Sequence, residues 1–421
     1  MNALFFYRQL WRIAPPLIRR YLKKRARNNP AYLLHWDERF GIPLAEPVQA
    51  PIWLHAVSVG ETHAAAPLVA ALRRRFPDAP LLITQMTPTG RAAAEKLFPE
   101  AQCRYLPYDK PEFAAQFLRE HRPRFGVLME TEIWPNLMHE CREQNVPLFL
   151  ANARLSEKSA RSYGKIRALI APALGTLRGC FAQTAADASR LAALGAPAPE
   201  VAGNTKYDIR PSENALALGE QWKVQAGRPV VVCGSTRVYR EEDETALLLQ
   251  AWRQYRGDAL LVIVPRHPER FNAAADTAAA LGFKVQRRSS GEPLRADTQV
   301  WIGDSMGETA AYYRMADLAF VGGSLVDSGC QNIIEPLACG TPVLFGFSTY
   351  NFAEACAGAL NEGAAVQVQT ADQWRETVEY LLENAAERAK LAANAATFIR
   401  QREGAGERMA ALIEEKLQKA V

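Results

Sequence analysis

Two small-residue turns and a carboxylate stand close together in the last third of the chain, in the stretch FVGGSLVDSGCQNIIEPLACGTPVLFG (320–346). An apolar strand is expected to end at Gly322–Gly323, and a second turn, 327–329, leads into a helix that carries Glu335. Glycine lets backbone N–H groups approach a phosphate, and a helix N-terminus favours negative charge. A carboxylate one turn further in can accept hydrogen bonds from ribose hydroxyls. The pattern predicts a sugar-nucleotide site; an ordinary strand–turn–helix with structural glycines is the alternative.

Acidic residues follow two apolar stretches in the first half of the chain. Glu61 ends the motif HAVSVGE, where it can act as a general base, although helix starts also attract acidic residues for dipole and capping reasons alone. Glu130 and Glu132 belong to ETEIWPN, directly after an apolar strand. Lys206, in GNTKYD, is either a solvated linker lysine or a cation beside a departing phosphate.

Polar turns also follow the strands expected in the second half of the chain. They are GSTR (234–237), PRHPER (265–270) and GDSMGE (303–308). An arginine such as Arg266 can pair with a phosphate in fork geometry. Because ligands bind at the carboxyl ends of strands in such sheets, these turns and the glycine-rich segment together predict one nucleotide site.

The spacing of aspartates and histidines does not favour a metal site. No two aspartates stand at D-x-D spacing, and the six histidines form no ligand cluster in the sequence. His55 and His63 are expected to be packing or surface residues. A donor with a single phosphate needs no metal to clamp a pyrophosphate, so the pattern favours a nucleoside-monophosphate sugar.

Apolar runs alternate with helical patterns from residue 51 onward, which is typical of βαβ units. Strands are expected at 52–57, 81–86, 125–129, 146–151, 180–183, 230–233, 260–264, 300–302, 318–321 and 343–345. Helices are expected at 62–76, 90–97, 159–177, 242–255, 271–281, 310–315, 333–338 and within 372–417. This rhythm predicts two doubly wound, Rossmann-like α/β domains that face each other across a cleft.

The length of 421 residues also favours two domains, because single cores stop growing at roughly 250–300 residues. The expected segments are an N-terminal membrane-associating piece, a first domain, a polar linker containing Pro211 and Gly227, and a second domain that includes the C-terminal helices. Their boundaries are 1–40, 41–207, 208–228 and 229–421.

The net charge of +5 is concentrated at the N-terminus. Residues 1–36 hold eight lysines and arginines and no acidic residue, which leaves −3 for the rest of the chain. Four of these cations fall on one side of a helix: Arg8, Arg12, Arg19 and Lys23. Pro15–Pro16 should kink or split that helix. Apolar and aromatic residues beside a basic stripe are typical of a monotopic anchor on anionic lipid, and the arginines interrupt them too often for a spanning helix. A docked helix with a solvated basic face is the alternative.

Composition excludes other classes of protein. The basic charge is not spread over a globular surface, so nucleic-acid binding is not expected. The seven cysteines stand without C-x-x-C pairs, which suits free thiols in a reducing compartment.

Taken together, the motifs resemble those of the 3-deoxy-D-manno-octulosonic acid (Kdo) transferases of lipopolysaccharide biosynthesis. The likeness runs in order through WDERFG, HAVSVGE, TPTG, YLPYD, ETEIWPN, NARLS, GNTKYD, VPRHPER, GDSMGE and FVGGSLV…N…EP, across almost the whole chain. It implies a glycosyltransferase-B fold, the donor CMP-Kdo and the acceptor lipid IVA, a lipid A precursor, at the cytoplasmic face of the inner membrane. It also implies inversion of the anomeric centre without a metal or another cofactor.

The resemblance further implies roles for single residues. Glu61 resembles the general base that deprotonates the acceptor hydroxyl, and Glu130 and Lys206 resemble residues that stabilise the transition state. The residues that resemble the CMP site are Pro265, Arg266, Met306, Gly307, Glu308, Asn332 and Glu335.

Two stretches depart from the family pattern. Residues 329–335 are GCQNIIE where the family usually has GGHNPLE, which keeps Asn332 and Glu335. Residues 234–242 are GSTRVYREE where the family has GSTHEGEE. Many members also begin with a clear spanning helix, whereas the basic, interrupted segment here favours peripheral attachment.

Two other functions fit parts of the pattern. One is another two-domain sugar-nucleotide enzyme, such as a hexosamine transferase or a UDP-sugar 2-epimerase, which would bind UDP in preference to CMP. The other is a catalytically silent nucleotide- or sugar-binding protein on a membrane surface, which would form no product.

Overall fold

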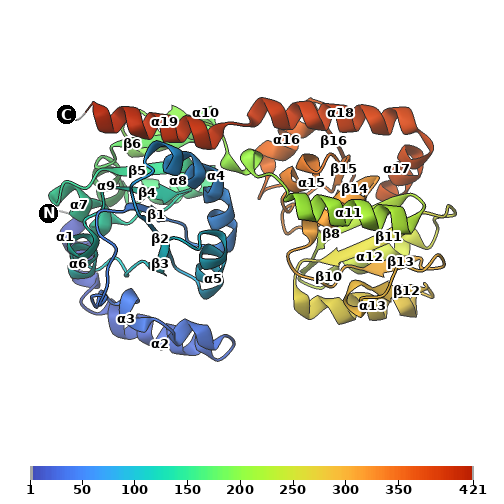
Figure 1. Cartoon of the computed structure of the whole chain (residues 1–421), viewed down its shortest axis with the longest axis horizontal. Coiled ribbons are helices and arrows are strands. Elements are labelled where there is room, and N and C mark those ends of the chain that lie inside the picture. The colour runs from blue at the N-terminus through green and yellow to red at the C-terminus, as the bar shows by residue number, and fades with distance from the viewer. Residues whose placement is uncertain (1–2, 420–421) are drawn as a thin grey trace. The chain divides into compact units, whose positions relative to one another are not determined.

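The computed structural model describes residues 3–419, so residues 1–2 and 420–421 of the expected terminal segments lie outside the described residues. The chain divides into two compact units. Unit 2 comprises Arg210–Gln401, and unit 1 comprises the described residues on either side of it. In each unit, helices lie on both sides of a sheet (Figure 1). The prediction of two Rossmann-like α/β domains is confirmed.

Seven strands of unit 1 form one parallel sheet in the order β3-β2-β1-β4-β5-β6-β7. They are β1 (Ile52–His55), β2 (Leu81–Gln85), β3 (Gln102–Tyr105), β4 (Phe125–Met129), β5 (Leu148–Ala153), β6 (Gly179–Ala182) and β7 (Glu200–Val201). The strand order reverses between β1 and β4, which makes their carboxyl ends the switch point where ligands bind in such sheets. Both strands are buried along their whole length, as parallel strands covered on two faces must be.

Helices cover both faces of this sheet, and many begin with a side-chain cap. They are α4 (Val59–Arg75), α5 (Pro88–Leu97), α6 (Pro111–His121), α7 (Pro135–Glu143), α8 (Glu157–Gly164), α9 (Arg167–Leu174), α10 (Ala185–Leu194) and α19 (Ala405–Gln418). One apolar core lies between the sheet and α4, α5 and α19, and the other lies beneath α6, α7, α9 and α10. Ser58 and Thr87 cap α4 and α5 by accepting a backbone N–H, which fixes where each helix begins after its strand.

Seven strands of unit 2 form a second parallel sheet in the order β12-β13-β11-β8-β14-β15-β16. They are β8 (Val230–Thr236), β11 (Leu260–Pro265), β12 (Val285–Arg287), β13 (Val300–Ile302), β14 (Leu318–Val321), β15 (Val343–Phe345) and β16 (Ala365–Gln367). The short strands β9 (Val238–Tyr239) and β10 (Glu242–Asp243) form a separate antiparallel pair. The switch point here lies between β8 and β14.

The helices of unit 2 enclose its sheet in the same way. They are α11 (Glu213–Ala226), α12 (Glu244–Trp252), α13 (Phe271–Ala280), α14 (Thr309–Met315), α15 (Ile334–Ala338), α16 (Ala353–Asn361), α17 (Ala371–Glu383) and α18 (Ala385–Arg402). One face of the sheet is covered by α12, α13 and α17, whose core residues include Leu248, Ala274 and Trp374. The other face is covered by α11 and α14, whose core residues include Trp222 and Tyr312.

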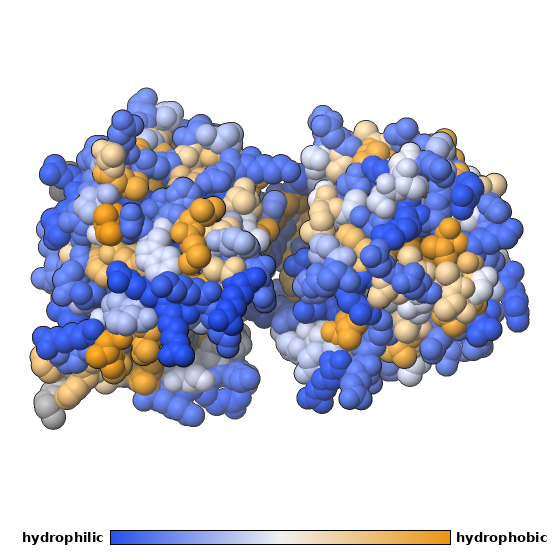
Figure 2. Space-filling view, turned by 90° about the horizontal axis from the view of Figure 1, so that it is seen from below, coloured by the Kyte–Doolittle hydropathy of each residue, from blue (hydrophilic) through white to orange (hydrophobic). Residues whose placement is uncertain are grey.

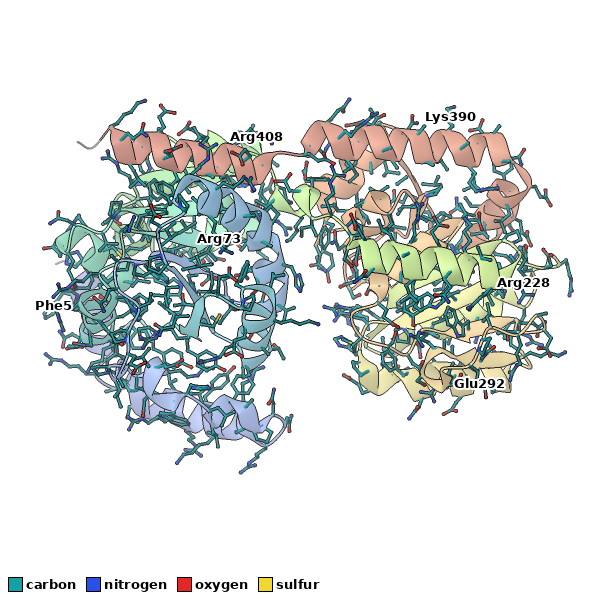
Figure 3. The ribbon with its side chains drawn as sticks, in the orientation of Figure 1. Phe5, Arg73, Arg228, Glu292, Lys390 and Arg408 are labelled. Carbon is teal, nitrogen blue, oxygen red and sulfur yellow. The ribbon has the colours of Figure 1, made fainter. Side chains whose placement is uncertain are left out.

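Two boundaries differ from the expected division. Most of the expected linker 208–228 is helix α11, which packs on α14 through Trp222, so it belongs to unit 2. The tail was assigned to the second domain, but its last helix, α19, packs against α4 of unit 1. Arg408 of α19, labelled in Figure 3, donates to the carbonyl of Ala202 at 3.0 Å. The buried side chains Met409 and Ile413 complete the core of unit 1, which the amphipathic pattern of α19 alone could not reveal.

The N-terminal segment consists of short helices attached to unit 1. They are α1 (Ala3–Leu10), α2 (Ala14–Ala26), the 3-10 turn η1 (Pro30–Leu33) and α3 (Trp36–Arg39). The helix is split before Pro15–Pro16, as predicted. Two of the four cations in the stripe contact unit 1. Arg8 donates to the Oδ1 of Asn136, and the Cζ of Arg19 lies 4.8 Å from the ring centre of Phe40. Within residues 3–419, the helices lack a stretch with the length and apolar character needed to cross a bilayer.

Replacing Ile413 with alanine should destabilise unit 1 by about 2–5 kcal/mol, because it empties a buried position between α19 and α4. Hydrogen exchange followed by mass spectrometry should show faster exchange in β1, β2 and β4. Ile399→Ala in α18 is the matched control, and it should leave those strands unchanged while loosening unit 2. Faster exchange confined to unit 2 in Ile413→Ala would contradict the placement of α19.

Candidate active site

Glu61 lies in the first turn of α4, directly after the carboxyl end of β1. Its Oε2 accepts the backbone N–H of Val57 at 2.6 Å, and its own N–H donates to the Ser58 hydroxyl at 3.4 Å. This is a form of capping box, so the capping interpretation describes one function of this carboxylate. The same two bonds hold the carboxylate at the switch point of the sheet, where a catalytic base would be needed.

The pKa of Glu61 lies near neutral pH. Burial raises the pKa of Glu61 to about 7, while the bond from Val57 opposes the shift and the charges of Glu130 and Glu132 add to it. A general base is most effective when its pKa lies near the working pH. Glu61 therefore has the position and the acidity of such a base.

Glu130 and Lys206 form an ion pair beside Glu61. Lys206 Nζ lies 2.9 Å from Glu130 Oε1, and their side chains are 18% and 21% exposed. Glu130 follows β4 with a φ of 56°, in the left-handed region, while its N–H stays bonded to the carbonyl of Ala151 on β5. The strained backbone turns the chain at the strand end, and strain of this kind is often found at functional sites.

Lys206 is positioned by a network that extends to the start of α19. It lies in the 3-10 turn η2 (Thr205–Asp208), whose first N–H donates to Asn152 Oδ1 at 3.1 Å. Asp208, at the other end of η2, accepts the N–H groups of Gly404 and Gly406 at 2.6 and 2.7 Å. Lys206 is therefore held from β5 on one side and from the start of α19 on the other.

Glu132 is a further acidic residue of the cluster, to which the motifs alone assign no role. The charges of both Glu130 and Glu132 act on Glu61, where they add to the rise of its pKa. Burial raises the pKa of Glu132, and Trp134 Nε1 donates to its Oε2 at 2.8 Å. The spacing E-T-E-x-W in the sequence is the signal that could have indicated this pair.

His55 lies under Glu132 and is a packing residue, as predicted. Its Nε2 is 3.9 Å from Glu132 Oε2, and its Nδ1 contacts the Thr84 carbonyl at 3.1 Å. Burial lowers the pKa of His55 to about 3, so the imidazole is neutral near pH 7 and does not cancel the charge of Glu132.

The first helix reaches the edge of this cluster through Asp109. Tyr7 donates its hydroxyl to Asp109 Oδ2 at 2.9 Å, and the backbone N–H groups of Asn136 and Leu137 donate to the same carboxylate at 3.1 and 2.8 Å. Arg8 adds a bond to Asn136 Oδ1 at 3.1 Å. Because these bonds meet at the start of α7, α1 stabilises the turn that carries Glu130 and Glu132.

Unit 2 brings together part of the predicted CMP site. Pro265 ends β11 and is buried, whereas Arg266 is exposed and its N–H donates to the carbonyl of Thr236 at 3.0 Å. Burial raises the pKa of Glu335 to about 7, against the lowering effect of the nearby Arg266. A cation and a carboxylate thus lie close together at the carboxyl ends of the strands, a suitable pair for a phosphate and a ribose.

The other predicted residues of this site differ in their surroundings. Met306 is 65% exposed, and Gly307 has a φ of 82°, which glycine adopts without strain. Glu308 is already paired, since Arg288 Nη2 donates to its Oε1 at 3.0 Å. Asn332 Oδ1 accepts the N–H of Ile334 at 3.1 Å and so shapes the turn before α15.

The glycine-rich turn uses its backbone N–H groups in a way that the sequence did not predict. Gly323, Ser324 and Leu325 all donate to the carboxylate of Glu244, a residue that sequence reasoning missed. These amides were expected to face a phosphate, and that interpretation is wrong for these three groups. Glu244 begins α12 only seven residues after the GSTR turn, and an acidic residue at a helix start is a weak signal that normally indicates capping.

Metal ligands do not cluster in the described part of the chain, where no group of three or more histidine, cysteine, aspartate or glutamate side chains could hold an ion. The acidic cluster of unit 1 is instead balanced by a lysine. A carboxylate with a pKa near neutrality, such as Glu61, can accept a proton, and the cations Lys206 in unit 1 and Arg266 in unit 2 can each attract an anionic group.

Comparisons with known sequences find similar proteins along most of the chain. Residues 34–209 match the family described as 3-deoxy-D-manno-octulosonic-acid transferase (kdotransferase), and residues 232–398 match glycosyl transferases group 1. A 3-deoxy-D-manno-octulosonic acid transferase of Bordetella pertussis is 42% identical over 89% of this chain and 90% of its own length. The protein of the same name from Haemophilus influenzae is 36% identical over 99% of both chains.

Solved structures agree on the fold. A UDP-GlcNAc 2-epimerase from Neisseria meningitidis has a TM-score of 0.59 at 15% identity, covering 88% of this chain and all of its own. A glycosyltransferase from Rickettsia africae also has a TM-score of 0.59, at 11% identity, covering 88% of this chain and 98% of its own. At these identities the likeness concerns the fold, which is of the glycosyltransferase-B type.

Substitutions in the acidic cluster should shift the pKa of Glu61 in opposite directions. Glu132→Gln removes a negative charge and should lower that pKa, whereas Lys206→Met leaves Glu130 unbalanced and should raise it. Carbon-13 NMR titration of glutamate-labelled protein can measure both shifts, with Glu61→Gln identifying the resonance. An equal pKa of Glu61 in the wild type, in Glu132→Gln and in Lys206→Met would show that these charges do not act on Glu61.

Proposed function

Since the chain belongs to the 3-deoxy-D-manno-octulosonic acid (Kdo) transferase family and is a glycosyltransferase, we propose that it moves Kdo from CMP-Kdo to the lipid A precursor lipid IVA. The observation that carries the proposal is the placement of Glu61, a carboxylate with a pKa of about 7 at the switch point of unit 1, beside the Glu130–Lys206 pair. The family relationship suggests the substrates, and the geometry of this cluster suggests the reaction.

The proposed step is a single displacement with inversion. Glu61 takes the proton of a primary hydroxyl of the acceptor while the hydroxyl oxygen forms a bond to the anomeric carbon of Kdo. The bond from that carbon to the CMP phosphate breaks, and its electron pair leaves with CMP. General base assistance of this kind is typically worth roughly 10²–10⁴-fold in rate.

The other charged residues would stabilise the charge that develops during transfer. Lys206, held by Glu130, offers a cation close to the base, and Arg266 offers one at the nucleotide side of the reaction. In unit 2 the CMP would contact Pro265, Met306, Gly307, Glu308, Asn332 and Glu335. Glu335, ionised in part at neutral pH, would accept hydrogen bonds from the ribose.

The proposed reaction needs neither a metal nor another cofactor. CMP-Kdo carries a single phosphate, so the leaving group lacks the pyrophosphate that a metal usually clamps. Its departing negative charge can be met by the guanidinium of Arg266 alone or together with Lys206.

The proposed location is the cytoplasmic face of the inner membrane, on anionic lipid. Apolar side chains of α1 and α2 are exposed, among them Phe5 at 55% (Figure 3) and Leu17 at 64%. Arg20, Lys23 and Lys24 of α2 are exposed beside them, around a hollow of about 640 Å³. On the side that carries α2, hydrophobic and hydrophilic side chains lie next to one another (Figure 2). Such a surface suits the boundary between lipid headgroups and acyl chains.

A transfer assay tests the proposal directly. Purified protein is mixed with lipid IVA and freshly generated CMP-Kdo in the presence of EDTA, and the products are followed by mass spectrometry. An increase in mass by one or more Kdo units would support the donor, the acceptor and the absence of a metal requirement. Folded protein that binds UDP but not CMP, and forms no such product, would favour the epimerase or hexosamine-transferase alternative.

Glu61→Gln should lower the rate of transfer by roughly 10²–10⁴-fold, because the amide cannot accept the proton. In the wild-type protein the rate should fall by about tenfold per pH unit below pH 7, as Glu61 becomes protonated. Stopped assays across pH 5–9 measure both effects. CMP binding by calorimetry is the control, and it should be unchanged in Glu61→Gln; a variant with normal turnover would exclude Glu61 as the base.

Reversing the charge of Arg20, Lys23 and Lys24 to glutamate should weaken binding to vesicles that contain anionic lipid by at least about tenfold, since each basic residue near such a surface contributes on the order of 1 kcal/mol. Vesicle co-sedimentation is the measurement. The exposed pair Arg253→Glu and Arg256→Glu in unit 2 is the matched control. If both variants bind like the wild type, α2 does not contact the lipid.

A further inference from the structure

A buried carboxylate joins the strand ends of the nucleotide-side unit. Glu244 has no exposed surface and begins α12. Its Oε2 accepts the N–H groups of Arg237 and Gly323 at 3.1 and 2.6 Å, and its Oε1 accepts those of Ser324 and Leu325 at 3.0 and 2.9 Å. One side chain thus binds the turn after β8 and the turn after β14, the two strands at the switch point of this sheet.

The hydrogen bonds around Glu244 extend to the predicted CMP residues. The Arg237 carbonyl accepts the N–H of Glu244 at 3.0 Å, so the short β9–β10 pair is closed at its base. Thr236, the residue before Arg237, accepts the N–H of Arg266 at 3.0 Å. On the other side, the carbonyl of Gly322 accepts the N–H of Gln331 at 3.0 Å, next to Asn332.

Gly322 is packed closely against the turn that follows β8. A Cβ added at Gly322 would lie 2.6 Å from the carbonyl oxygen of Ser235 and 2.8 Å from Glu244 Oε2. The backbones of the two turns therefore lie in close contact, and the carboxylate of Glu244 lies beside this contact. Loss of the carboxylate would leave three buried N–H groups and the part-buried one of Arg237 without their acceptor, and each buried group left in this way is costly.

We propose that Glu244 is a positioning residue for the donor: it occupies the ring of backbone N–H groups that a phosphate takes in many nucleotide-binding turns, and it thereby fixes Arg266 and the Asn332–Glu335 segment to receive the nucleotide. An internal anion replaces the ligand's anion at these amides. The donor phosphate is then bound through side chains, above all Arg266, and the three amides of 323–325 do not contact it. This inference rests on the proposed function for the identity of the nucleotide.

The proposal predicts that Glu244 affects the binding of the donor and not the chemical step, so KM and kcat should respond differently to its substitution. Glu244 acts on the nucleotide side, whereas the base Glu61 lies in unit 1. Glu244→Gln keeps the size of the side chain but turns an amide N–H₂ toward N–H groups. It should raise the KM for CMP-Kdo by about tenfold or more while kcat changes little, because misplacing a binding group weakens the ground-state complex.

Calorimetric titration with CMP is the direct measurement. Glu244→Gln should bind CMP at least about tenfold more weakly than the wild type. Asp317→Asn is the matched control, because Asp317 accepts the N–H of Val230 at 3.0 Å at the opposite end of the same strands. It should lower the melting temperature without changing CMP affinity. CMP binding by Glu244→Gln equal to that of the wild type would overturn the inference.

A second variant covers the case in which Glu244→Gln does not fold. Glu244→Asp keeps the charge but withdraws the carboxylate from 323–325, and it too should weaken CMP binding; unchanged affinity would overturn the inference. The wild-type titration separates this result from failure of the proposed function. A wild-type protein that binds UDP in place of CMP would refute the donor, and the same comparison of variants with UDP would then decide the role of Glu244.

Discussion

The burial of Glu61 beside two other carboxylates is the physical constraint on which the acidic cluster of unit 1 depends. Three glutamates lie at the carboxyl ends of β1 and β4, and like charges held together make proton loss more difficult. Burial, with a smaller contribution from the charges of Glu130 and Glu132, raises the pKa of Glu61 to about 7, a value at which a carboxylate can both take and release a proton near neutral pH. Lys206 offsets part of this negative charge through its ion pair with Glu130, at 2.9 Å.

In both units a carboxylate lies near the switch point, at the start of the first long helix after the first strand of the sheet. In unit 1 Glu61 keeps one strong backbone bond and remains partly exposed, so it is free for chemistry. In unit 2 Glu244 is fully buried and takes four backbone bonds, so it is structural support for its neighbours. The carboxylate that we propose as the base thus accepts fewer backbone hydrogen bonds than the one that we propose as a positioning residue.

The sequence predicted the strands well where both faces are buried, because β4 and β8 then become continuous apolar runs. It failed at β3, whose residues Gln102–Tyr105 are partly polar at a sheet edge, and at α11, whose polar surface resembles a linker. The motifs located Glu61, Glu130 and Lys206, but not the left-handed turn at Glu130 or the occupation of the glycine amides by Glu244. Those features depend on contacts between segments distant in sequence, which local patterns do not encode.

The return of α19 makes unit 1 discontinuous along the chain. Unit 2 is one uninterrupted stretch, Arg210–Gln401, inserted between two pieces that pack into a single core. Recombination between relatives can therefore exchange the nucleotide-side unit as a cassette with two junctions. Exchange of the other unit requires that both of its pieces come from the same parent, because Asp208 and the backbone of Gly404 and Gly406 must match across the junction.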